Sequence, residues 1–152
     1  MTRDLVGGDR WAQLGRRELI ALGRATVTHW LEDLGCSVDA SGGPLQVMTP
    51  SGRRLEVFVS TQRVGGYAFW TKRRLPLAVE RLVAIVVLDG DDEPAVYVVP
   101  TSEWRSAQPP LRDRPNVGKK SEPEYGVSLA RSSLPALGRY GARQPATLEQ
   151  FR

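Results

Sequence analysis

Residues 42–62, GGPLQVMTPSGRRLEVFVSTQ, carry the clearest local structural signal of the chain. Two largely apolar runs, Leu45–Thr49 and Leu55–Ser60, flank the segment Pro50-Ser51-Gly52-Arg53. Proline and glycine stand there at positions that a tight turn accepts. Apolar and β-branched runs on both sides of such a turn are typical of a β-hairpin, so we predict two paired strands.

A helix is predicted before this hairpin. From about Trp11 to Leu34, apolar residues recur at steps of three and four, which indicates an amphipathic helix. Gly35 follows where a helix C-cap is expected. Cys36–Val38 is then predicted as a short strand or an extended lead into the hairpin.

Further strands are predicted after the hairpin. Tyr67–Trp70 follows a Gly-Gly turn, and we expect it to be a third strand beside the hairpin in a meander. Arg81–Leu88 is apolar at consecutive positions, as in a central strand that is covered on both faces. Ala95–Val99 predicts another strand, and Thr101–Trp104 predicts the start of a short helix.

The C-terminal third is predicted to be less regular. Proline and charge dominate Ala107–Pro123, which indicates a loop. Tyr125–Leu129 predicts a late edge strand, and Thr147–Phe151 a short terminal helix. The expected fold is α/β (α+β), one domain over residues 1–152, with an N-terminal helix packed on a mixed central sheet and a core within about residues 11–105.

Composition excludes several classes of site and partner. The 152 residues are 41% hydrophobic with a net charge of +4, and no apolar run approaches the length of a membrane span. The N-terminus lacks the apolar segment of a secretory signal, so we expect a cytoplasmic protein with no membrane partner. Cys36 and His29 are the sole cysteine and histidine, which excludes thiolate cages and multi-histidine metal sites.

Several segments share their order and spacing with a known family. They are the helix end Trp30–Gly35, the hairpin, Val57-Phe58-Val59-Ser60-Thr61, the turn Gly65-Gly66-Tyr67, the apolar strand, and Val96-Tyr97-Val98-Val99-Pro100. Over about Leu22 to Trp104 this pattern resembles the PD-(D/E)XK nuclease superfamily, in its branch of small resolvase-like and intron-endonuclease-like proteins. The resemblance implies a restriction-endonuclease-like fold.

The resemblance also implies a degenerate active site. In the family, a helix glutamate, the aspartate of the Pro-Asp pair and a (Asp/Glu/Gln)-x-Lys pair gather around Mg²⁺, which needs oxygen ligands to activate water. The matching positions here are Arg24, Leu45, Phe58 and Ser60. Because none is a carboxylate, we expect no metal, no cofactor and no phosphodiester cleavage there, with Arg24 in the former metal site and paired with Glu56 or Glu18.

Basic residues near the hairpin suit contact with phosphate. The stretch Gln62–Arg74, QRVGGYAFWTKRR, interleaves them with aromatic residues. Strand alternation places Tyr67 and Phe69 on one face and Ala68 and Trp70 on the other, so one pair is expected in the core. A meander would bring the basic residues into one rim. The candidate phosphate contacts are Arg53, Arg54, Arg63, Lys72, Arg73 and Arg74.

The sequence therefore favours a catalytically inactive nuclease-like domain that binds the phosphate backbone of DNA or RNA, or that forms a complex. Two alternatives remain open. One is a protein-interaction subunit, or a homodimer, that uses the apolar former site and the proline-rich loop. The other is an active Mg²⁺-dependent nuclease with migrated carboxylates, for which Glu18, Glu56 and Asp39 are the candidates.

Overall fold

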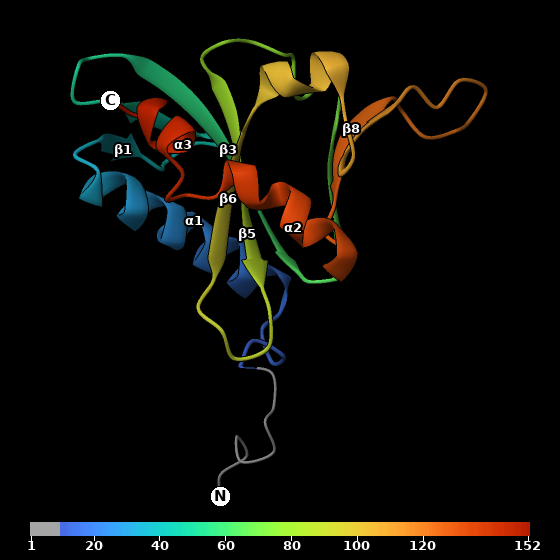
Figure 1. The fold of residues 1–152 in the computed structure, drawn as a ribbon, viewed down its shortest axis with the longest axis horizontal. Helices are drawn as coiled ribbons and strands as arrows, with labels where there is room; N and C mark the ends of the chain where they lie inside the picture. Colours follow the sequence, from blue (N-terminus) through green and yellow to red (C-terminus); the bar gives the residue numbers. More distant parts are fainter. Residues whose placement is uncertain (1–9) are drawn as a thin grey trace, which may run out of the picture.

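The computed structural model describes residues 10–152, which form a mixed α+β fold with two β-sheets (Figure 1). The strands are β1 (Ser37–Asp39), β2 (Leu45–Met48), β3 (Arg54–Arg63), β4 (Tyr67–Thr71), β5 (Arg81–Leu88), β6 (Ala95–Pro100), β7 (Leu111–Arg114) and β8 (Glu124–Ser128). The helices are α1 (Arg16–Asp33), α2 (Leu134–Leu137) and α3 (Pro145–Glu149), with 3-10 turns η2 (Thr101–Ser106), η3 (Arg131–Ser133) and η4 (Gly138–Tyr140).

The larger sheet has the strand order β1-β2-β3-β5-β6. The predicted hairpin is confirmed, since β2 and β3 pair antiparallel with Leu45 opposite Val57. Gly52 stands at a φ of 91° in the turn, a conformation that glycine adopts without steric cost. β3 and β5 run parallel, whereas the other pairs are antiparallel, which makes the sheet mixed.

The third strand does not join the hairpin, so the predicted meander is wrong. β4 pairs with β8, which also pairs with β7, in a separate three-stranded sheet. The turn before β4 is tied to the end of β8, because Gly65 donates to the Leu129 carbonyl and Leu129 donates to that of Gly66. β8 is therefore central rather than an edge, and β7 lies inside the predicted loop and forms, with β8, the projecting hairpin of Figure 1.

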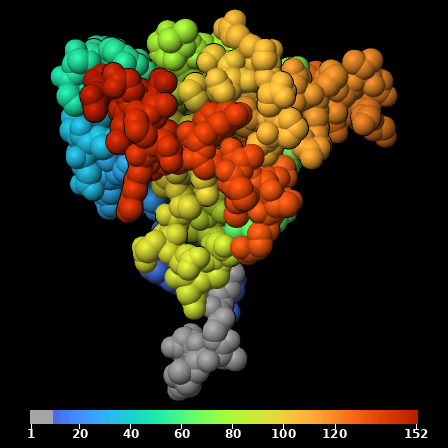
Figure 2. All heavy atoms as spheres, viewed as in Figure 1, coloured from blue at the N-terminus to red at the C-terminus, as the bar shows by residue number. Residues whose placement is uncertain are grey.

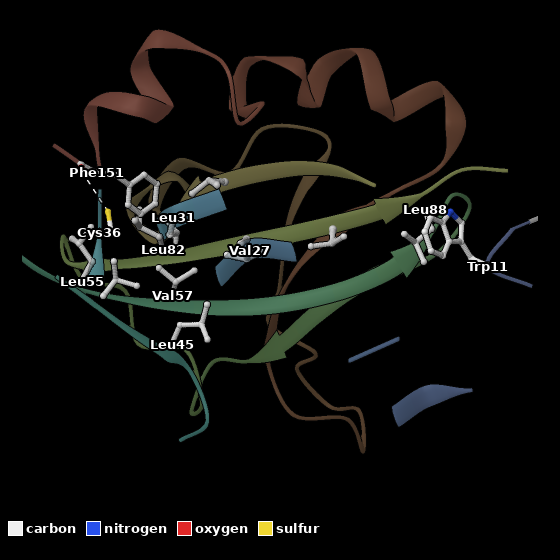
Figure 3. Packing of buried hydrophobic residues seen from close by; sticks show 14 residues of the cluster. Trp11, Val27, Leu31, Cys36, Leu45, Leu55, Val57, Leu82, Leu88 and Phe151 are labelled. Atoms are coloured by element: carbon white, nitrogen blue, oxygen red, sulfur yellow. Dashed lines mark hydrogen bonds between the residues drawn. The ribbon is translucent and has the colours of Figure 1, made fainter. Parts of the chain in front are cut away.

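Two hydrophobic cores cover the two faces of the larger sheet. On one face, Val27 and Leu31 of α1 pack with Leu45 and Val57 (Figure 3). On the other face, the small sheet packs through residues such as Trp70. Residues of β5 alternate between the two cores, which confirms a central strand that is covered on both sides.

The C-terminal region completes both cores, so the core extends beyond the predicted residues 11–105. Phe151 is 1% exposed in the α1-side core, where its ring meets Trp30 edge-on. Its carbonyl accepts a hydrogen bond from the Cys36 thiol (Figure 3). Leu129 and Leu137 are buried in the core beneath the small sheet. The C-terminal segment, red in Figure 2, lies across the face shown there.

Helix α1 is held close to β3 at a glycine. A Cβ atom added to Gly23 would lie 1.7 Å from the Thr61 hydroxyl oxygen, so only glycine permits this approach. The helix ends at Asp33 with Leu34 as its C-cap, one residue before the predicted cap position, and Gly35 follows at a φ of 92°. Among the helices of residues 10–152, none is long and apolar enough to cross a bilayer.

Candidate functional site

The four positions that match the nuclease motif do not meet in one place. Leu45 pairs with Val57 and is fully buried on the α1 side of the sheet. Phe58 is one residue further along β3, so it packs against the opposite core, and Ser60 shares its side. Because adjacent strand residues face opposite ways, the hairpin does not bring Leu45 and Phe58 onto one face of the sheet.

Arg24 has a structural partner that differs from the expected carboxylate. Its guanidinium donates to the carbonyls of Ala40 at 2.7 Å, Gly42 at 3.1 Å and Gly43 at 2.5 Å. These carbonyls belong to the loop between β1 and β2. Since unpaired carbonyls of a loop suit the fork of donors on arginine, Arg24 ties α1 to this loop rather than to Glu56 or Glu18.

Glu56 is engaged on the opposite face of the hairpin. Arg81 Nε donates to one carboxylate oxygen at 2.7 Å, and the Gln46 amide donates to the other at 3.2 Å. Burial raises the pKa of Glu56, but these hydrogen bonds and the Arg81 charge outweigh it and hold the pKa below its ordinary value. Both oxygens of the Glu56 carboxylate are therefore hydrogen-bonded to side chains of the sheet.

We expect Glu56 to stabilise the fold in its ionised form. Because the pKa of Glu56 in the folded protein is lower than the unfolded value of 4.5, the ionised carboxylate adds stability at pH values above 4.5. This stability is lost as the pH falls through the folded pKa. Glu56→Gln should therefore unfold more easily than wild type at pH 7, with the difference shrinking below about pH 4. Urea unfolding across pH checks this against Glu149→Gln; a constant difference would contradict it.

The other candidate carboxylates also have local partners. Glu18 accepts the backbone N–H of Gly15 at 2.8 Å and so caps α1. Asp39 accepts both the N–H and the hydroxyl of Ser41, which lower the pKa of Asp39. Within the described part of the chain, no three histidine, cysteine, aspartate or glutamate side chains are grouped as a metal site requires.

The structure divides the predicted basic rim. Arg53 lies in the hairpin turn and Arg54 begins β3, where it lines a hollow of about 300 Å³ beside β1 and β2. Lys72 and Arg73 follow β4 in the other sheet. The meander that was expected to join the two groups is absent, since β4 belongs to the separate sheet.

Three of these basic residues have partners within the fold. Lys72 pairs with Asp113 at 2.5 Å and lies over the Tyr125 ring. Arg73 forms a two-pronged contact with Glu122. Arg63 donates to the carbonyls of Trp11 and Leu14, at 2.6 and 3.2 Å, and so ties the segment before α1 to β3.

A cleft of about 660 Å³ lies between the first half of α1, the second half of β3 and β4. Its floor follows β3 beyond Val57, where pairing with β2 stops and only β5 remains alongside. Its walls carry Ile20 from α1 and Phe69 from β4, which are 47% and 55% exposed. The cleft thus joins an open strand edge to exposed apolar side chains.

The charge of the cleft is of one sign. Arg16, Arg63 and Arg74 line it together with the polar side chains Ser60, Thr61, Gln62 and Thr71, and no lining residue in the described chain is acidic. Arg16 and Arg74 are exposed, and neither has an ion pair within residues 10–152.

Comparison of the chain with family models, curated proteins and solved structures found no match.

Sequence analysis identified only part of this cleft. It included Arg63 and Arg74 among the basic candidates and separated Phe69 from Trp70 by strand alternation, which the burial of Ala68 and Trp70 confirms. It missed Arg16 and Ile20, which lie 29 and 25 residues before Leu45, the first residue of the hairpin. No local signal marked them in the sequence, because their exposure depends on how α1 packs against the sheet.

Proposed function

We propose that this domain binds nucleic acid through the cleft and does not cleave it. The observation that carries the proposal is the pair of exposed, unpaired arginines, Arg16 and Arg74, in a cleft free of acidic lining among the described residues. Arginine forks bind phosphate in two-pronged fashion. Positive charge without an internal counter-ion favours a polyanionic ligand, because binding releases the counterions of the phosphates.

In this proposal, the chain is a catalytically inactive relative of the PD-(D/E)XK nucleases that its sequence resembles. The N-terminal helix on a mixed sheet is compatible with a restriction-endonuclease-like fold. Leu45 and Phe58 face different cores, and Glu56 is held by Arg81. These contacts favour binding over metal-dependent hydrolysis, which requires several free oxygen ligands at one point.

Neutralising the two cleft arginines should weaken binding. For Arg16→Gln/Arg74→Gln we expect about tenfold lower affinity for a fluorescein-labelled oligonucleotide at low salt. The slope of log affinity against log salt should fall by about 1.4–1.8, because each phosphate contact contributes 0.7–0.9. Fluorescence anisotropy at several salt concentrations measures both quantities.

The matched control is Arg53→Gln/Arg54→Gln, which removes the same charge far from the cleft along β3. The control should retain the wild-type slope. An equal loss in both variants would show that net charge, rather than the cleft, determines binding. Failure of the wild-type protein to bind single strand or duplex at low salt would overturn the proposed function.

A further inference from the structure

The outer face of the small sheet carries an exposed aromatic surface beside the cleft. Ala68 and Trp70 of β4 face the core, so Tyr67 and Phe69 face outward. Phe69 is opposite Gly126 of β8, which is itself opposite Arg112 of β7. Because Gly126 has no side chain, the ring of Phe69 has no cross-strand side chain beside it on β8.

The aromatic surface is built in layers. The rings of Tyr67 and Phe69 stack with centroids 6.1 Å apart and planes 21° apart. The guanidinium of Arg114 lies 4.6 Å from the Tyr67 centroid. A Cβ atom on Gly126 would come within 1.9 Å of the Tyr67 hydroxyl, so this glycine lets Tyr67 lie across β8. The ring of Phe69 is therefore stacked on Tyr67, and Phe69 is 55% exposed to solvent.

The surroundings of Phe69 are mainly basic. Arg112 is exposed on β7, which β8 separates from β4, and Arg74 lines the cleft together with Phe69. The acidic side chain of this face, Glu124, is 12% exposed and lies 4.0 Å from Arg114. An anion whose planar groups can stack is the ligand that complements this combination of charge and ring.

We propose that the cleft and this face take single-stranded nucleic acid, with phosphates near Arg16, Arg74 and Arg112 and one base stacked on Phe69. This inference rests on the proposed function and adds the class of ligand. In a duplex the flat faces of the bases are covered by their neighbours, whereas a single strand offers an unstacked base to an exposed ring. Ile20 bounds the base on the opposite wall of the cleft.

The test compares three fluorescein-labelled probes about ten nucleotides long: a single strand, its duplex, and an abasic strand with the same number of phosphates. The wild-type protein should bind the single strand about tenfold more tightly than the abasic strand. Phe69→Ala should abolish this difference. Phe69→Trp should preserve it. Because Phe69 is exposed, these variants are expected to fold, and Val117→Ala is the control at another exposed apolar residue.

Gly126→Ala provides an independent variant, since it leaves the Phe69 and arginine side chains in the sequence but displaces Tyr67, on which Phe69 stacks. It should reduce the preference for the single strand over the abasic strand. If the single strand, the duplex and the abasic strand bind equally well and Phe69→Ala changes nothing, the stacking inference is overturned while nucleic-acid binding stands. If none of the probes binds, the proposed function itself fails.

Discussion

Replacing Gly23 by alanine is expected to lower the free energy of unfolding by about 2–4 kcal/mol, although alanine is the better helix former by about 1 kcal/mol. The added Cβ would lie 1.7 Å from the hydroxyl oxygen of Thr61 and 3.0 Å from its Cβ. Thr61 is on β3, so relief of this overlap requires Thr61 to change rotamer, α1 to move away from the sheet, or both. Movement of α1 separates Val27 and Leu31 from the core.

Two comparisons isolate this effect. Ala25→Gly, at an exposed position of the same helix, measures helix propensity alone and should cost about 1 kcal/mol. Thr61→Ala should cost little, because the buried Thr61 hydroxyl has no hydrogen-bond partner within residues 10–152. The double variant Gly23→Ala/Thr61→Ala should be more stable than the sum of the two single effects predicts.

Urea unfolding followed by circular dichroism measures these free energies. Gly23→Ala should also weaken oligonucleotide binding, since α1 carries the cleft residues Arg16 and Ile20. A Gly23→Ala variant that is as stable as wild type would show that α1 does not require this close approach.

The second large effect is expected at Trp104, which joins the two sheets. Trp104 is 1% exposed, meets Trp70 and Tyr125 with ring centroids 6.3 and 6.0 Å away, and donates its indole N–H to the Gly126 carbonyl at 3.1 Å. Trp104→Ala should cost about 3–5 kcal/mol, because it leaves a cavity and removes the hydrogen bond to the Gly126 carbonyl.

Hydrogen exchange should show where this stability is lost. In Trp104→Ala we expect the amides of β4, β7 and β8 to exchange faster than those of β3 and β5, since the small sheet depends on this contact. Trp104→Phe keeps a ring but loses the hydrogen bond, so a loss of about 1–2 kcal/mol is expected. Uniform loss of protection over both sheets would instead indicate that they unfold as one unit.

Local patterns predicted the elements that depend on neighbours in sequence. The hairpin turn at Pro50–Arg53, the apolar run of β5 and the alternation in β4 were each recognised, because turn chemistry and side-chain period act over a few residues. The partner of β4 was not recognised. Its neighbour β8 lies more than fifty residues later, and no local signal encodes that distance.

The register of the hairpin strands and the partners of charged residues could also not be predicted from the sequence. A single-residue shift decides whether Leu45 shares a face with Val57 or with Phe58, and a motif match does not resolve one residue. The partner of Arg24 could not be predicted either, because backbone carbonyls of a loop leave no pattern of residue types. Arg16 was missed since its importance depends on a cleft that only packing creates.

By itself, the sequence determined the N-terminal helix, the hairpin, the buried strand β5, and the alternation that separates Tyr67 and Phe69 from Ala68 and Trp70. Turn residues and hydrophobic periods are short-range properties, and they survive in any tertiary arrangement. Only the tertiary structure decided that β4 leaves the hairpin and that Arg16 and Phe69 line one cleft. Such choices depend on burying Trp70 and Trp104 between two sheets, a long-range gain in hydrophobic contact that no short stretch of sequence contains.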